Sequence, residues 1–408
     1  LSKSFTALAC CILAAEGKMD LDDPVVKYLP NLHIPGVPDE LVTVRQLGLH
    51  RAGLPPMETL EWSIVMNTPG RKSKYDKQLV KEAPNKMETI DQIIDYISEG
   101  LYPALGEPGE YMSYSNEGYA LLSYIVDAAA GITLEQFLME RIFEPLGMSR
   151  SVLDLDASEI KEMVGAENVT LLHQKNSKGK VIEDDNWSIL PPFRGCACVK
   201  STAQDLAKYY QMLANGGVFE GKRIIPEKAC ELMFGPEYPL RRKPFNVMGL
   251  RKLLVEGRMV CEHGGALHGV SARGGFVEGG YSAVVLSNDS NKSTEALHWM
   301  CYNYIFGNEL DKDLNWCQPG GSEFSRPEMI VGDYVGHEGI VSHNLVYQRD
   351  GKLMLRSGED IYELQHCEAT VFAVINPKTG KRVDTYRFFI RDGMAWACKC
   401  GSRIFRRA

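Results

Sequence analysis

This 408-residue sequence has no apolar segment as long as the roughly 18 residues that a membrane-spanning helix requires. The apolar run from Phe5 to Ala15 falls well short of that length. A strongly basic segment is also missing, because the net charge is −8 and basic residues cluster only in the short stretch Arg403–Arg407. We therefore expect neither a membrane partner nor a nucleic-acid partner.

Paired Cys-x-x-Cys motifs are missing too, although the sequence contains eleven cysteines. One residue separates Cys196 from Cys198 and Cys398 from Cys400, whereas structural zinc sites usually combine two Cys-x-x-Cys pairs. An odd number of cysteines is also unusual for the disulfide framework of a secreted protein. We therefore expect reduced, mostly buried thiols, a cytoplasmic location and no bound metal.

Helical spacing dominates the first half of the sequence. Residues 4–17 are apolar on nearly all sides, which predicts a buried helix that ends at Gly17. Thr89 with Gln92 forms a capping box, and Ser201 with Gln204 opens a further predicted helix. Between them, the polar, lysine-rich residues 54–88 predict a long surface excursion or lid.

The periodicity changes in the second half. Short apolar segments separated by glycines or charges predict antiparallel strands over 246–255, 258–262, 270–277 and 280–287. A helix with the sequence STEALHWMCYNYIFG follows them. Residues 310–329 carry glycine, proline and charge and predict a linker. Residues 330–408 are strand-like and contain hairpin turns such as Asp350-Gly351 and Asp392-Gly393, so we expect a separate β-domain there.

The first residues of the sequence allow two interpretations. In a signal peptide, Lys3 would be the positive end, residues 5–15 the apolar core and Ala14-Ala15 the cleavage region. In a buried core helix, further residues would precede Leu1. Local sequence alone leaves both interpretations open.

Two short motifs carry side chains suited to proton transfer. Lys3 opens the first predicted helix, where burial would lower its pKa and make it a usable base. The alternative is a lysine that extends from a helix end into solvent. Tyr114 and Asn116 precede another helix and point the same way, so the phenol could relay a proton and the amide could bind a polar group. The alternative makes Asn116 a helix N-cap and Tyr114 a packing residue.

A third motif is His263-Gly264-Gly265, at a predicted strand. Its glycines allow close approach of a ligand to the backbone, and the N–H that follows, on Ala266, could stabilise an oxyanion. The alternative is a glycine-rich hairpin with an incidental histidine.

The order of these motifs, a lysine in a buried helix, then Tyr-Ser-Asn, then His-x-Gly, resembles the serine β-lactamase and penicillin-binding-protein-like superfamily. Longer segments are similar as well, among them FTALACCILAAEGKMDLDDPVVKYLP and PGEYMSYSNEGYALLSYIVDAAAG. The resemblance covers most of residues 1–309, and residues 330–408 are similar to the lipocalin-like domain attached to some S12-type serine peptidases. It implies an α+β fold: an antiparallel sheet flanked by helices, an all-helical subdomain and a small C-terminal β-barrel.

In that superfamily the nucleophile is the serine of Ser-x-x-Lys. Counting back from Lys3 places this serine immediately before Leu1, which favours the core-helix interpretation over the signal peptide. We interpret two other Ser-x-x-Lys matches, Ser158–Lys161 and Ser177–Lys180, as coincidences of sequence. The same holds for Lys378-Thr379-Gly380, which matches the third motif of many β-lactamases but lies in the C-terminal domain.

The resemblance implies nucleophilic catalysis through an acyl-enzyme. Lys3 would take the proton of the serine, Tyr114 would pass it to the leaving group, and Asn116 would orient the substrate. His263 would contact the leaving side or a substrate carboxylate. The N–H groups of the serine and of Ala266 would form the oxyanion hole, and Gly265 would help to bind the substrate.

The expected function is therefore a serine hydrolase of amide or peptide bonds that needs no metal or organic cofactor. Its substrate would be a small-molecule or peptide acyl compound, and a homo-oligomer is possible. The alternatives are an esterase or an acyltransferase with the same site, or a non-catalytic scaffold with another residue in place of the serine.

Overall fold

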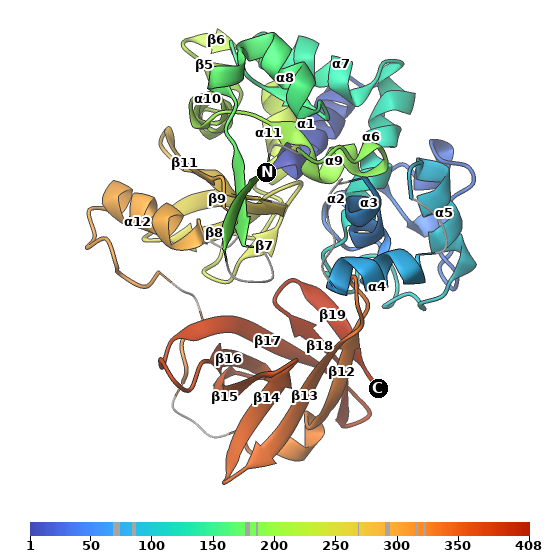
Figure 1. Cartoon of the computed structure of the whole chain (residues 1–408), viewed down its shortest axis with the longest axis vertical. Coiled ribbons are helices and arrows are strands. Elements are labelled where there is room, and N and C mark those ends of the chain that lie inside the picture. Colours follow the sequence, from blue (N-terminus) through green and yellow to red (C-terminus); the bar gives the residue numbers. More distant parts are fainter. Residues whose placement is uncertain are drawn as a thin grey trace.

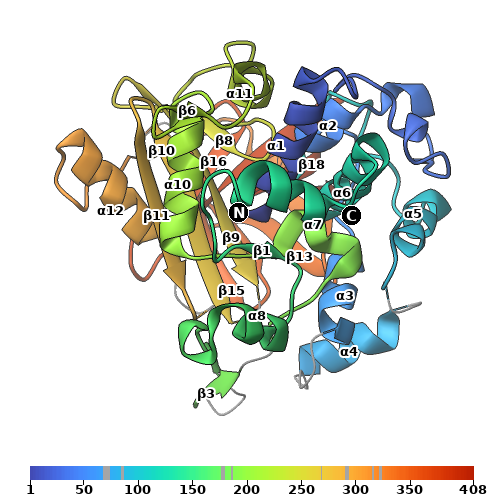
Figure 2. The ribbon, with the colours of Figure 1, turned by 90° about the horizontal axis from the view of Figure 1, so that it is seen from above.

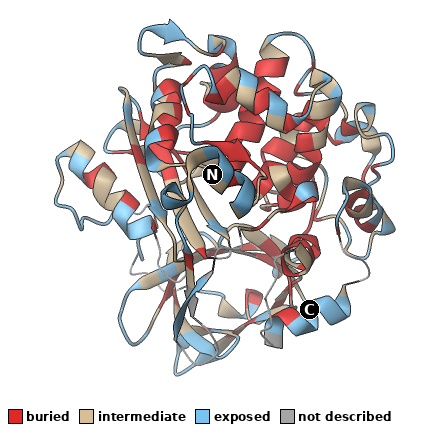
Figure 3. Ribbon diagram, turned by 45° about the horizontal axis from the view of Figure 1, so that its top comes forward, coloured by how far each residue is buried: buried red, intermediate tan, exposed pale blue. Residues whose placement is uncertain are grey.

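A computed structural model describes residues 1–67, 74–83, 87–175, 180–184, 187–267, 269–289, 294–314, 317–320 and 324–408. In Figure 1 the C-terminal strands form a barrel below, while the other helices and strands lie above it. Viewed from above, the helices gather beside the sheet formed by β8 to β11 (Figure 2). Buried residues concentrate in these helices (Figure 3).

Helix α1 (Ser2–Ala15) forms the centre of the larger core. Every residue from Ser2 to Leu13 is buried, which confirms the predicted core helix. The helix packs against α6 (Asn116–Ala130), α9 (Arg194–Ala197) and α11 (Glu227–Phe234). It ends two residues before the predicted Gly17, which follows in a left-handed conformation.

The remaining helices surround this core. They are α2 (Val44–Gly48), α3 (Thr59–Asn67), α4 (Lys74–Glu82), α5 (Ile90–Glu99), α7 (Leu134–Leu138), α8 (Ala157–Val164) and α10 (Ala203–Ala214). The capping box of Thr89 with Gln92 is present, whereas α10 is capped by Thr202 and not by Ser201. Among the described residues, no single helix is long and apolar enough to cross a membrane, although the bent pair 116–130 and 134–143 satisfies that criterion when joined.

The prediction that residues 54–88 form a surface excursion is wrong for their first part. Helix α3 is buried over most of its length because Leu60, Trp62 and Ile64 pack into the core. The lysine-rich composition of the following residues concealed this apolar segment. Residues 68–73 and 84–86 lie outside the described residues.

A five-stranded antiparallel sheet stands beside the helical core. Its strands, in spatial order, are β11 (Tyr281–Ser287), β10 (Val270–Val277), β9 (Arg258–Leu267), β8 (Arg251–Val255) and β7 (Phe245–Asn246). Because side chains alternate along a strand, Phe276 joins the core that contains α10, while Val277 joins a second cluster with α12 (Glu295–Phe306). Helices therefore cover both faces, as the predicted fold class requires.

Short paired strands decorate the helical region. They are β1 (Val152–Leu153) with β4 (Val199–Lys200), β2 (Leu172–Lys175) with β3 (Val181–Asp184), and β5 (Val218–Phe219) with β6 (Lys222–Arg223).

The C-terminal strands close into an eight-stranded antiparallel barrel. They are β12 (Gly332–Gly336), β13 (Ser342–Arg349), β14 (Lys352–Ser357), β15 (Asp360–Glu368), β16 (Val371–Ile375), β17 (Arg382–Arg391), β18 (Met394–Cys400) and β19 (Arg403–Arg407). Pairing of Tyr334 with Arg407 closes the barrel. Asp392 and Gly393 both have positive φ, as a tight hairpin turn requires, so the predicted turn is confirmed.

Candidate active site

A cavity of about 1740 Å³ lies where the start of α1, the sheet and the barrel meet. All the site residues predicted from the sequence line it: Lys3, Tyr114, Asn116, His263, Gly265 and Ala266. Of the other two Ser-x-x-Lys matches, Ser158–Lys161 does not line this cavity. Ser158 is exposed on α8 and donates a hydrogen bond to Asp156, while Ser177 lies outside the described residues.

Lys3 occupies the first turn of α1, with only 3% of its surface exposed. Its Nζ donates hydrogen bonds to Asn116 Oδ1 at 2.8 Å and to the carbonyl of Cys196 at 3.2 Å, and it lies 4.8 Å from the centre of the Tyr114 ring. Burial disfavours the ammonium, but attraction to Tyr114 and Cys196 outweighs it, so the pKa of Lys3 lies above its usual value. The expectation of a lowered pKa for Lys3 is therefore wrong.

Tyr114, just before α6, and Asn116, the first residue of α6, both line the cavity. The N-cap of α6 is Ser115, whose Oγ accepts the N–H of Gly118 at 3.0 Å, so the interpretation of Asn116 as the N-cap is wrong. The Asn116 amide is therefore available to hold Lys3. The Ser115 hydroxyl also donates to the buried carboxylate of Glu117 at 2.9 Å, which ties the turn to the helix.

His263 faces Tyr114 from β9. Its Nδ1–H donates to the carbonyl of Gly264, which leaves Nε2 free to accept the hydroxyl of Tyr114 at 3.4 Å. Burial and nearby positive charges, including that of Lys3, hold the pKa of His263 well below its usual value. The imidazole is therefore neutral near pH 7. A Cβ at Gly265 would lie 3.1 Å from the backbone nitrogen of Leu1, so a side chain here would crowd the start of α1.

His50 is a site residue that the sequence did not reveal. Its Nδ1 accepts the N–H of Ser115 at 3.1 Å, and its ring lies 4.3 Å from that of Tyr114. Burial and repulsion from Lys3 hold the pKa of His50 well below its usual value, so it acts as a neutral acceptor that positions the Tyr-Ser-Asn turn. A lone histidine far from the three motifs carries no signal of this role.

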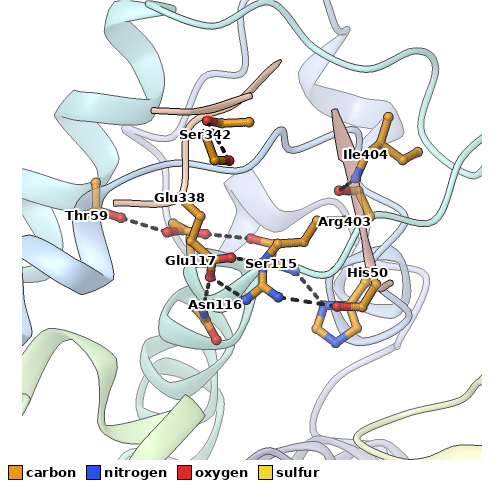
Figure 4. A network of polar contacts seen from close by, with 12 residues as sticks. His50, Thr59, Ser115, Asn116, Glu117, Glu338, Ser342, Arg403 and Ile404 are labelled. Atoms are coloured by element: carbon orange, nitrogen blue, oxygen red, sulfur yellow. Dashed lines mark hydrogen bonds and ion pairs between the residues drawn. The ribbon is translucent and has the colours of Figure 1, made fainter. Parts of the chain in front are cut away.

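The barrel supplies a second group of residues that the sequence did not reveal (Figure 4). The carbonyl of Ser402 accepts the N–H of Tyr114 at 2.9 Å, and the Arg403 guanidinium lies 4.9 Å from the Tyr114 ring centre. Arg403 also forms a two-point ion pair with Glu338, whose Oε1 accepts the Asn116 amide at 3.3 Å. The barrel therefore forms one wall of the cavity and holds two of the predicted site residues.

Within the described part of the chain, no group of three or more His, Cys, Asp and Glu side chains is placed to hold a metal ion. The predicted motifs bring an amine, a phenol, an amide and an imidazole into the cavity.

Comparison with known proteins matches residues 1–300 to the beta-lactamase family. A penicillin-binding protein of Bacillus subtilis (strain 168) is 29% identical over 219 residues, which are 52% of this chain and 43% of that protein. A beta-lactamase of Providencia stuartii is 26% identical over 212 residues, or 52% of this chain and 45% of that protein. The chain thus spans about half the length of the curated relatives it matches.

Solved structures extend the similarity of fold to the barrel. An octameric penicillin-binding protein homologue from Pyrococcus abyssi has a TM-score of 0.63 and 22% identity, over 99% of this chain and 86% of that one. A D-amino acid amidase from Ochrobactrum anthropi SV3 has a TM-score of 0.52 and 25% identity, over 71% of this chain and 74% of that one. Because the family match covers residues 1–300 and the cavity gathers the residues that its motifs place there, the chain belongs to the beta-lactamase family.

Proposed function

We propose that this protein is a serine hydrolase that cleaves amide or peptide bonds through a covalent acyl-enzyme. The observation that carries the proposal is the buried contact between Lys3 and Asn116 at 2.8 Å, with Tyr114 and His263 beside them in one cavity. Membership of the beta-lactamase family and the resemblance to a D-amino acid amidase support this reaction class.

The nucleophile in this proposal is a serine immediately before Leu1, at the start of α1. Leu1 lines the cavity and lies next to Gly265, so such a serine would face Lys3 and β9. Its hydroxyl oxygen attacks the substrate carbonyl, and its proton passes to the pair formed by Lys3 and Tyr114. The amine form of Lys3 accepts this proton and the Tyr114 hydroxyl relays it; because the pKa of Lys3 is raised, that form is a small fraction at neutral pH.

Collapse of the tetrahedral intermediate breaks the carbon–nitrogen bond, and Tyr114 returns the proton to the leaving nitrogen. His263, neutral and hydrogen-bonded to the Tyr114 hydroxyl, orients that phenol toward the leaving side. The N–H groups of the serine and of Ala266 bind the oxyanion, and each such donor is typically worth about 3 kcal/mol in the transition state. Water then cleaves the serine ester and releases a carboxylic acid.

The test uses the natural full-length protein and a fluorophosphonate probe. We expect one covalent adduct by intact mass, located by peptide mapping on a serine directly before Leu1. Lys3→Met should lose the adduct, whereas Lys161→Met, at the other described Ser-x-x-Lys match, should keep it. Absence of an adduct in the wild-type protein, or an adduct on another residue, would overturn the proposal.

Matched D-amino acid amides and methyl esters then separate the possible activities. Release of ammonia from the amides supports the amidase, while turnover of esters alone would reassign the protein to the esterases. Product formation that depends on an added amine or alcohol acceptor would instead identify an acyltransferase.

A further inference from the structure

The barrel wall of the cavity is rich in positive charge. Arg382 and Arg387 on β17, Lys399 on β18 and Arg403 on β19 all line the cavity. The facing loop before β7 adds Lys243, so basic groups approach from both sides. None of these residues belongs to the three motifs that mark the reacting end of the cavity.

Two of these cations are direct neighbours. Arg387 and Lys399 are register partners in the antiparallel pair of β17 and β18. Like charges opposite each other across a ladder destabilise a sheet, unless a counter-charge lies between them. Asp384, a cavity-lining carboxylate on the same strand, accepts the backbone N–H of Thr385 and attracts Arg382 and Lys399 from beyond ion-pair distance.

Arg403 and Lys243 have carboxylate partners, whereas among the described residues Arg387 and Lys399 do not. Arg403 pairs with Glu338, and Lys243 lies 3.9 Å from Glu368. In the described ranges of the chain, no carboxylate lies within the 4.0 Å ion-pair distance of Arg387 or Lys399. Burial and repulsion from Lys243 and Arg387 lower the pKa of Lys399 to about 7, as expected for a buried ammonium with no described carboxylate at ion-pair distance.

The position of this pair relative to the site follows from Met112. The Lys399 ammonium lies 3.8 Å from the sulfur of Met112, which lines the same cavity as Tyr114. Lys399 is also close enough to His50, whose ring packs against Tyr114, to lower the pKa of that histidine, so it lies beside the proposed reacting centre. An anion held there would therefore belong to the part of the substrate beyond the scissile bond.

We infer that Arg387 and Lys399 form a subsite for an oxyanion group, a carboxylate or a phosphate, carried by the substrate. That the bound anion is part of a substrate rests on the proposed hydrolase activity, whereas the anion site itself does not depend on catalysis. An arginine offers a planar fork of donors to such a group, and a lysine offers a compact charge. One anion between them offsets the repulsion across the two strands.

A matched pair of substrates tests the subsite. D-Alanine p-nitroanilide is capped on its amine with a succinyl group or with the uncharged methyl ester of that group. We expect the wild-type protein to have a higher kcat/KM for the charged substrate. Lys399→Gln and Arg387→Gln should each reduce this preference by about 10- to 100-fold without lowering kcat/KM for the neutral substrate.

Arg391→Gln is the control, because Arg391 is exposed on the same strand and lies away from the cavity lining. It should retain the full preference of the wild-type protein. Equal kcat/KM for the two substrates in the wild-type protein, or an equal loss in all three variants, would overturn the subsite while leaving the hydrolase intact.

A binding measurement separates the two proposals. Inorganic phosphate and glutarate are titrated into the wild-type protein and Lys399→Gln by calorimetry. Binding that the substitution abolishes supports the subsite even if neither anilide is turned over, in which case only the proposed hydrolase fails. Phosphate binding alone identifies a phosphate group and glutarate binding alone a carboxylate, whereas no binding of either anion to the wild-type protein overturns the subsite.

Discussion

Replacing Arg403 by glutamine should weaken the attachment of the barrel to the active site. Arg403 contacts the Glu338 carboxylate through two nitrogens, and the two side chains are 23% and 26% exposed. Breaking a fully buried ion pair costs about 3–5 kcal/mol, and an exposed pair contributes about 1 kcal/mol or less. For a pair about three-quarters buried, we expect Arg403→Gln to lower the free energy of unfolding by about 1–3 kcal/mol.

A double-mutant cycle with Glu338→Gln isolates this interaction. Urea unfolding of the wild-type protein, the two single variants and the double variant should show a coupling of about 1–3 kcal/mol, because the second substitution removes the charge that the first leaves unpaired. Labelling by the fluorophosphonate probe should follow the same pattern, since Glu338 also accepts the Asn116 amide. Additivity within about 0.5 kcal/mol would refute the reasoning.

The pH dependence gives a second check of the same pair. Burial raises the pKa of Glu338 above its usual 4.5, and attraction to Arg403 opposes that rise. A carboxyl with a raised pKa in the folded state contributes stability that is fully present below the unfolded pKa and is lost as pH rises through the folded pKa. Glu338→Gln should therefore gain stability relative to the wild-type protein as pH rises above 4.5. The gain from Glu338→Gln should be larger when it is made in the Arg403→Gln variant. A difference that does not change with pH would contradict this account.

Three further predictions follow from α1 and the cysteines. Lys3→Met should slow fluorophosphonate labelling by about 10²- to 10⁴-fold with unchanged circular dichroism, and unchanged labelling would exclude its role in proton transfer. Gly249→Ala should lower Tm more than Gly257→Ala. Both glycines have positive φ, but only at Gly249 would the new Cβ lie 2.6 Å from the α1 backbone. Equal Tm values for the two variants would contradict this close approach. The sulfurs of Cys317 and Cys367 are 2.6 Å apart, so oxidation by diamide should join them in a disulfide. This disulfide should stabilise the folded protein by at most about 4 kcal/mol. Non-reducing peptide mapping should detect it, and a different cysteine pairing would count against the geometry.

The sequence by itself determined the features that depend on neighbouring residues. The apolar run of α1, the capping box at Thr89 and the turn at Asp392-Gly393 follow from short-range interactions. The antiparallel strands are also marked by their apolar segments and glycines, although the strand predicted over 246–255 divides into β7 and β8, and the one predicted over 258–262 extends to Leu267. The family motifs added the predicted site residues Lys3, Tyr114 and His263, and these line one cavity.

Only the tertiary structure decided which groups surround those motifs. Glu338 and Arg403 reach Asn116 and Tyr114 because the barrel packs against the helical region, a contact between residues more than 200 positions apart. The direction of the Lys3 pKa was equally hidden, because burial and attraction act against each other and their balance depends on atomic distances. Local sequence encodes secondary structure through short-range interactions, but charges and hydrogen bonds between distant segments exist only once the chain has packed.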